Sequence, residues 1–226
     1  MSITYAIPDL HGRIDLLEAA LDQIASNASG RVSTIVTLGD YVDRGPDSRQ
    51  VIEKLMDWQS DNLKLVALKG NHEAMMWETC NNLADLDWWI TNGGDQTLRS
   101  YGSFEGNDVR TVPAAHLRWI AGLALMHVDR HRIFVHAAVD PDVSLDHQSE
   151  RTLLWNRYPI GSVTGHGNRH VVHGHQAMTR APVVMKHRTN LDAKAWKTGR
   201  LIVGIFEDDK AGGASEFLEI LDQPTL

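Results

Sequence analysis

Three apolar segments in the first third of the chain, each ending in a loop, restrict the possible folds most. Alternation of apolar and polar residues, or a high content of β-branched residues, predicts strands at 3–7, 34–38 and 63–68. Apolar residues at helical spacing follow the first two segments, at 14–24 and 51–56. Strands that alternate with helices are typical of a largely parallel sheet, so this region predicts an α/β fold.

The rest of the chain departs from this simple alternation. Helical spacing with many Trp and Met residues predicts a mostly helical insertion over about 74–130. Its tryptophan pair, at positions 88 and 89, is interpreted either as core or as one wall of a substrate groove. Apolar strands are expected again at 132–135 and before "HGH" at 173–175, and residues 201–206 and 217–221 predict a closing hairpin.

Size and composition limit the class of protein. With 226 residues, of which 42% are hydrophobic, the chain can bury one sizeable core, so we expect a single domain over 1–226. The net charge of −7 and the lack of a Lys/Arg cluster argue against a nucleic-acid partner. Cys80 is the only cysteine, which fits a reducing compartment and gives no indication of a cysteine-based metal site.

Targeting signals are not visible in the sequence. The first seven residues are too short for a signal peptide, and no apolar run approaches the roughly 18 residues of a membrane span. We therefore expect a cytoplasmic protein without a membrane partner.

Residue types that bind metal ions follow the expected strands, one short loop at a time. In α/β sheets, sites form in the crevice outside the carboxyl ends of the strands, so five separate loops would meet there. Carboxylate, amide and imidazole donors together suit Mn, Fe or Zn. The residues are Asp9, His11, Asp40, Asn71, His72, His136 and His175.

Each of these motifs has an ordinary explanation when it is taken alone. Asp9 and His11 could be incidental surface residues, "GDYVDRG" a turn, and "GNHE" a helix cap through Asn71. Residues i and i+2 of an extended chain point the same way, however, so Asp9 and His11 can reach one ion. Occurrence of all the motifs, in order and each at a strand end, favours a shared metal site.

The same segments resemble the phosphoprotein phosphatase branch of the calcineurin-like metallophosphoesterases, and are nearest to the small bacterial and bacteriophage lambda-type enzymes. The resemblance extends from Tyr5 to about Gly204. It implies an αββα sandwich of two mixed sheets flanked by helices. The segments that carry it are "PDLHG" (8–12), "GDYVDRG" (39–45), "GNHE" (70–73), "NGGDQT" (92–97), "VHAA" (135–138), "LLWNR" (153–157) and "HGH" (173–175).

The resemblance also implies a cofactor of two divalent metal ions, with Mn first and Fe or Zn as alternatives. Asp40 would bridge the two ions. The ligands implied for the first ion are Asp9, His11 and Asp40, and those for the second are Asp40, Asn71, His136 and His175.

Further roles follow from the resemblance for residues beside these ligands. Arg44 and Arg157, together with Asn71, would bind the substrate phosphate, since guanidinium groups match phosphate geometry. His72 would protonate the leaving group as general acid, and Asp43 would orient and charge its imidazole.

The implied function is metal-dependent hydrolysis of phosphoserine and phosphothreonine, or of phosphotyrosine, in proteins by direct attack of a metal-bridging hydroxide. The alternative is a symmetrical dinucleoside tetraphosphatase (diadenosine tetraphosphate hydrolase), and other phosphorylated small molecules also fit. The intact Asp43, Arg44 and Glu73 favour the protein phosphatase. A non-catalytic phosphate-sensing protein is the least favoured reading, because no expected ligand is missing. The oligomeric state stays open.

Three segments depart from the family pattern. Pro8 replaces a glycine and removes one backbone N–H, which predicts a shifted loop with Asp9 and His11 retained. Ala138 stands where relatives have glycine, which matters only if that position needs a positive φ. "NLDAKAW" (190–196) replaces an Asp-Thr-Gly-like turn. His173 is left open between an ordinary buried histidine and a residue that supports a ligand.

Overall fold

Two five-stranded sheets form the centre of the computed structural model, which describes residues 2–222. The first sheet has the order β10-β9-β1-β2-β3. Strands β1, β2 and β3 are parallel, β9 is antiparallel to β1, and β10 is antiparallel to β9. This arrangement confirms the parallel units and the closing hairpin. Its strands are β1 (Ile3–Ile7), β2 (Ser33–Thr37), β3 (Leu63–Ala67), β9 (Arg200–Glu207) and β10 (Glu216–Leu221).

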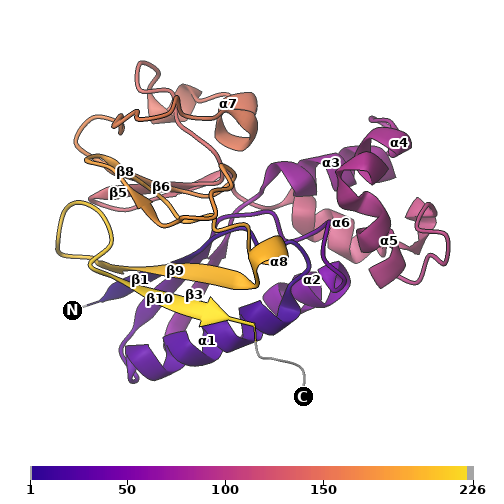
Figure 1. Cartoon of the computed structure of the whole chain (residues 1–226), viewed down its shortest axis with the longest axis horizontal. Coiled ribbons are helices and arrows are strands. Elements are labelled where there is room, and N and C mark those ends of the chain that lie inside the picture. Colours follow the sequence, from indigo (N-terminus) through magenta and orange to yellow (C-terminus); the bar gives the residue numbers. More distant parts are fainter. Residues whose placement is uncertain (1, 223–226) are drawn as a thin grey trace.

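Alternation along β1 explains how this sheet is covered on both faces. Tyr5 and Ile7 belong to a core shared with α1 (Ile14–Ala28) and α2 (Ser48–Met56), whereas Ala6 between them belongs to a separate core. Successive side chains of a strand point to opposite faces, so one strand contributes to both cores. Figure 1 shows α1 and α2 lying along the outer face of this sheet.

The second sheet packs against the first and carries its own outer layer. Its order is β4-β5-β6-β8-β7, with β5, β6 and β8 parallel. Phe134 and Val172 join Ala6 in the core between the sheets, while Ile133 packs outward with α7 (Glu150–Trp155). The expected αββα sandwich is therefore confirmed (Figure 1). The strands are β4 (Met126–Val128), β5 (Arg132–Val135), β6 (His170–His173), β7 (Val183–Val184) and β8 (Arg188–Asn190).

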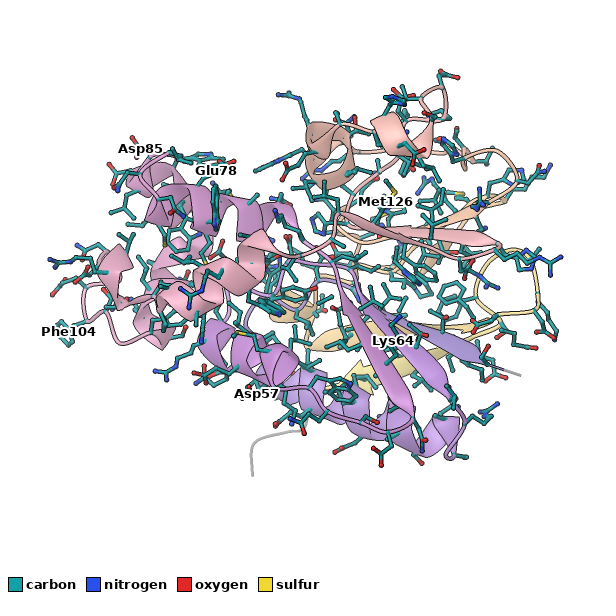
Figure 2. The ribbon with its side chains drawn as sticks, turned by 180° about the vertical axis from the view of Figure 1, so that it is seen from behind. Asp57, Lys64, Glu78, Asp85, Phe104 and Met126 are labelled. Carbon is teal, nitrogen blue, oxygen red and sulfur yellow. The ribbon has the colours of Figure 1, made fainter. Side chains whose placement is uncertain are left out.

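The segment that links β3 of the first sheet to β4 of the second is mostly helical, as expected, and projects beside the sheets. Figure 2 shows Glu78, Asp85 and Phe104 on this projecting part. Its bounds differ from 74–130, because its first helix already begins at Asn71 and β4 pairs with β5 near its end. A three-residue strand is too short to show a period in the sequence. The elements are α3 (Asn71–Cys80), α4 (Leu86–Trp89), the π-helical turn η1 (Ile90–Gly94), α5 (Asp95–Ser100), η2 (Val109–Thr111) and α6 (Ala114–Ala121).

Several short elements have no counterpart in the sequence-based prediction. They are β7, β8, the turn η3 (Leu145–His147) and the helices α7 and α8 (Ala195–Thr198). Elements of two to six residues owe their conformation to pairing and packing more than to local propensity. The predicted domain 1–226 includes Met1 and 223–226, which lie outside the described residues. Between residues 2 and 222, no helix has both the length and the apolar character that crossing a membrane requires.

Candidate active site

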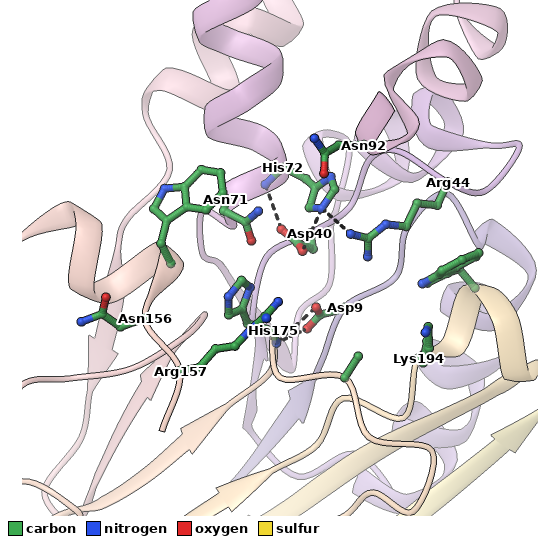
Figure 3. A pocket seen from close by; sticks show the side chains of 13 residues that line it. Asp9, Asp40, Arg44, Asn71, His72, Asn92, Asn156, Arg157, His175 and Lys194 are labelled. Atoms are coloured by element: carbon green, nitrogen blue, oxygen red, sulfur yellow. Dashed lines mark hydrogen bonds and ion pairs between the residues drawn. The ribbon is translucent and has the colours of Figure 1, made fainter. Parts of the chain in front are cut away.

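The loops that follow β1, β2, β3, β5 and β6 meet at one edge of the two sheets, as the sequence predicts (Figure 3). The backbone N–H of His175 donates to Asp9 Oδ1 at 3.0 Å, although 166 positions separate these residues. The backbone N–H of His72 donates to Asp40 Oδ1, also at 3.0 Å. Residues from distant parts of the chain therefore come within direct contact.

The backbone of these loops is bent into an uncommon conformation. Eight described non-glycine residues have positive φ, and six of them border the site: His11, Asp40, Asp43, Arg44, His175 and Lys194. Such conformations cost free energy and persist where the surrounding structure holds them, which is typical of functional sites. Glycine makes the close approach of two loops possible, since a Cβ on Gly39 would collide with the backbone of Gly70.

Two buried histidines are oriented as metal ligands. Nδ1–H of His11 donates to the carbonyl of Val42 at 2.7 Å, and Nδ1–H of His136 donates to the carbonyl of Leu38 at 2.8 Å. Burial lowers the pKa of both imidazoles well below the ordinary value, so both are neutral and each Nε2 carries a lone pair. A backbone carbonyl that fixes the tautomer in this way is the usual support of a metal-binding histidine.

Both Nε2 atoms face the carboxylate of Asp40. The distance is 3.5 Å from His11 Nε2 to Asp40 Oδ2 and 3.4 Å from His136 Nε2 to Asp40 Oδ1. Asn71 Oδ1 lies 2.9 Å from His136 Nε2, so two acceptors point at each other. A cation placed between them would satisfy this set, and the donors present therefore fit divalent metal ions.

The ligand atoms form two groups that share Asp40, one with His136 and His175 and the other with His11 and His72. The shared carboxylate agrees with the expected bridge. The second group differs from the expectation, because it contains His72, whereas Asp9 belongs to neither group. Asp9 is buried close by, and burial, together with the neighbouring Asp192 carboxylate, raises its pKa well above the ordinary value.

The structure brings together the expected acid and its partner. His72 Nδ1 lies 2.6 Å from Asp43 Oδ2, so Nδ1–H donates to the carboxylate. Asp43 also accepts from Trp89 Nε1–H at 3.0 Å and from the Thr97 hydroxyl at 2.7 Å, and it is fully buried. Burial lowers the pKa of His72 despite the opposing effect of Asp43. A bound phosphate dianion would favour the charged imidazolium.

Arg44 bridges the two histidines of this side. It donates to His11 Nε2 at 2.7 Å and to His72 Nε2 at 2.9 Å. Each hydrogen bond uses the lone pair of an Nε2 atom. A metal ion bound to His11 Nε2 would break the first, and a proton on His72 Nε2 would break the second. Binding of either would therefore free the guanidinium to turn toward a phosphate.

A cavity of about 670 Å³ opens above these residues. The exposed Arg157 lines it on the side of Asp9 opposite to Arg44 (Figure 3). Sequence reasoning missed several of its lining residues. Asn92 and Asn156 stand inside the quoted "NGGDQT" and "LLWNR" segments, so the motifs already marked their neighbourhood. The missed residues are Asn92, Trp155, Asn156, Ala177, Lys194 and Trp196.

Glu73 has a structural role that the motif alone did not explain. Its carboxylate accepts from the backbone N–H groups of Asp40 at 2.8 Å, Tyr41 at 2.7 Å and Gly70 at 2.8 Å. It thereby ties the loop after β2 to the start of α3. This buried carboxylate fixes the backbone that presents Asp40.

Pro8, Ala138 and His173 were singled out in the sequence. The loop after Pro8 is held by the N–H groups of Leu10 and His11, which both donate to the carbonyl of Asp40. Ala138 is not among the residues with positive φ, so glycine is not required there. His173 Nε2 contacts Arg188 at 3.0 Å and none of the expected ligands.

The two tryptophans of the pair lie in different environments. Trp89 is fully buried and bonds to Asp43. Trp88 is 40% exposed and stacks on Trp155, with ring centroids 6.1 Å apart. Trp155 lines both the cavity and a neighbouring groove that Trp88 borders.

A family model for calcineurin-like phosphoesterases matches residues 4–195, and the chain belongs to this family. Serine/threonine-protein phosphatase 2 of Escherichia coli K12 is 33% identical over 92 residues, which are 40% of this chain and 38% of the relative. This relative agrees with the phosphoprotein phosphatase branch.

A symmetrical bis(5'-nucleosyl)-tetraphosphatase of Pseudomonas fluorescens Pf0-1 is 30% identical over 144 residues, which are 63% of this chain and 43% of the relative. The chain thus spans less than half the length of either curated relative. A crystal structure described as a possible diadenosine tetraphosphatase superposes with a TM-score of 0.68 at 19% identity, covering 99% of this chain and 95% of that one. This last likeness concerns the fold.

Divalent metal should stabilise the folded chain measurably. An ion at 100 times its Kd contributes about 2.7 kcal/mol, and about 1 kcal/mol shifts the Tm of a chain of this size by roughly 2–4 °C. We therefore expect a rise of about 5–10 °C per site when Mn²⁺ replaces a chelator in a thermal melt. A KCl solution of equal ionic strength is the control, and an unchanged Tm with Mn²⁺ would contradict the metal site.

Proposed function

We propose that the chain is a dinuclear-metal-dependent phosphoric-ester hydrolase. The observation that carries the proposal is the pair of unprotonated Nε2 atoms, on His11 and His136, that face the two oxygens of Asp40 at 3.5 and 3.4 Å. With Asp9, Asn71 and His175, these residues would hold two divalent ions, Mn²⁺ first, whose charge lowers the pKa of bound water.

The surrounding side chains would bind and orient the phosphate. Arg44 and Arg157 line the cavity from opposite sides of Asp9, so their guanidinium groups can balance charge on two different phosphate oxygens (Figure 3). Asn71 contributes its amide from the start of α3. The short contact between His72 and Asp43 would orient the imidazole whose Nε2 protonates the leaving oxygen.

The acid pair supports phosphoserine and phosphothreonine in proteins as substrates. An alkoxide leaves poorly without a proton, and the buried Asp43, fixed by Trp89 and Thr97, is positioned to orient the acid that supplies it. The similarity to the Escherichia coli serine/threonine phosphatase supports the same class.

A symmetrical dinucleoside tetraphosphate is the second candidate, and a separate observation favours it. Three cationic side chains line the cavity, namely Arg44, Arg157 and Lys194, and a polyphosphate carries more charge than a monoester. The Pseudomonas tetraphosphatase also aligns over a larger share of this chain than the Escherichia coli phosphatase does, 63% against 40%.

One substrate panel tests both classes. We expect turnover of p-nitrophenyl phosphate with Mn²⁺ and none with chelator. Phosphoserine peptides and diadenosine tetraphosphate are then compared by kcat/KM on the same preparation, with metal content measured. Absence of metal-dependent turnover on every substrate would overturn the proposal and leave the phosphate-sensing alternative.

A further inference from the structure

Lys194 stands at an unusual place in the backbone. Its φ of 62° and ψ of 48° lie in the left-handed region, which is uncommon for a residue other than glycine, asparagine or aspartate. The conformation is held because the Lys194 N–H donates to Oδ1 of the buried Asp192 at 2.8 Å. The fold therefore maintains a costly conformation that brings this side chain to the rim of the cavity.

The ammonium group of Lys194 forms no close ion pair among residues 2–222, although its charge favours the ionised form of the buried Asp192 carboxylate. No carboxylate of the described chain lies within ion-pair distance of its Nζ, whereas Lys210 and Lys54 each have such a partner. Nζ lies 5.7 Å from the ring centroid of Trp196, and the guanidinium carbon of Arg44 lies 5.6 Å from the same ring. Trp196 thus lies in contact with two cations that border one cavity.

Lys194 lies on the far side of the cavity from Arg157. In Figure 3, Lys194 lies on the Arg44 side of Asp9, while Arg157 approaches from the other side. Arg44 and Arg157 are the residues already proposed to bind the scissile phosphate. A cavity of about 670 Å³ has the size of a site for a drug-sized ligand, so it extends well beyond one phosphate.

We propose that Lys194 is a specificity-determining residue that binds a second phosphate group, joined to the scissile phosphate by an anhydride bond. This inference rests on the proposed two-metal phosphohydrolase and selects the phosphoanhydride class, a nucleoside polyphosphate, as its substrate. The charge at Lys194 adds to that at Arg44 beside the same Trp196 ring, so a second phosphate group would meet two cations there. A phosphomonoester presents no group to this position.

The test compares inorganic tripolyphosphate and orthophosphate as competitive inhibitors of p-nitrophenyl phosphate hydrolysis. Lys194→Gly removes the charge and keeps the backbone conformation, because glycine adopts positive φ readily. One charge-assisted hydrogen bond is worth a factor of about 10 to 100, so the tripolyphosphate preference should fall by that factor. Lys194→Arg should retain most of the preference. Lys197→Ala is the matched control, because Lys197 is an exposed lysine of the following helix α8 and lies outside the cavity.

Calorimetry with tripolyphosphate on the metal-loaded protein gives a readout that does not need turnover. Parent protein that binds tripolyphosphate more tightly than Lys194→Gly supports the inference even if p-nitrophenyl phosphate is not hydrolysed, which would count against the proposed function alone. An unchanged inhibition ratio and unchanged calorimetry in Lys194→Gly would overturn it. So would an effect of Lys194→Gly confined to acidic phosphoserine peptides, which would assign the lysine to a protein substrate.

Discussion

Asp40→Asn is expected to remove metal from both positions and to reduce turnover to near background. The two carboxylate oxygens of Asp40 face different histidines, at 3.5 Å from His11 Nε2 and 3.4 Å from His136 Nε2. Asparagine keeps one oxygen, which can still accept from the backbone N–H of His72, but it replaces the other with a group that cannot bind a cation. One substitution therefore disrupts both sites.

Metal content per chain and kcat/KM on p-nitrophenyl phosphate measure this effect. Asp142→Asn is the matched control, because Asp142 is exposed and does not line the cavity. Near-UV circular dichroism establishes that the Asp40 variant is folded. Two equivalents of metal retained together with substantial turnover would show that Asp40 does not bridge.

His72→Asn is expected to lower the rate on a phosphoserine peptide far more than on p-nitrophenyl phosphate. Serine leaves as a poor alkoxide and needs a proton in the transition state, whereas nitrophenolate leaves without one. General acid catalysis is worth about 10²–10⁴-fold, and the difference between the two substrates should lie in that range. Metal content should be largely unchanged, since Asn71 and not His72 is the predicted ligand.

Asp43→Asn should show the same asymmetry more weakly, because Asp43 acts through the imidazole that it contacts at 2.6 Å. The grouping of His72 with His11 and Asp40 makes the metal measurement decisive. Loss of metal in His72→Asn would reassign His72 as a ligand. Equal rate losses on both substrates would assign it to substrate positioning.

The sequence by itself predicted the parallel β–α units and placed metal-binding residue types after the strands, and the family resemblance added the two-sheet sandwich. Strand and helix periods are local properties, so the β1–α1–β2–α2–β3 order is readable without coordinates. Asp9, Asp40 and His175 were predicted to lie together for the same reason: each follows an apolar strand, and the ends of parallel strands meet at one edge. The short strands β4, β7 and β8 were missed because two or three residues carry no period.

Only the tertiary structure decided which side chains contact one another. The pairing of Asp43 with Trp89 and Thr97 joins residues 46 and 54 positions apart, and no local pattern encodes such a contact. The close grouping of His72 with His11 and Asp40, to which Asp9 does not belong, depends on side-chain directions at bent loops. Lys194 reaches the cavity because a buried aspartate two residues earlier holds its backbone in a left-handed turn, and burial is a property of the folded chain as a whole.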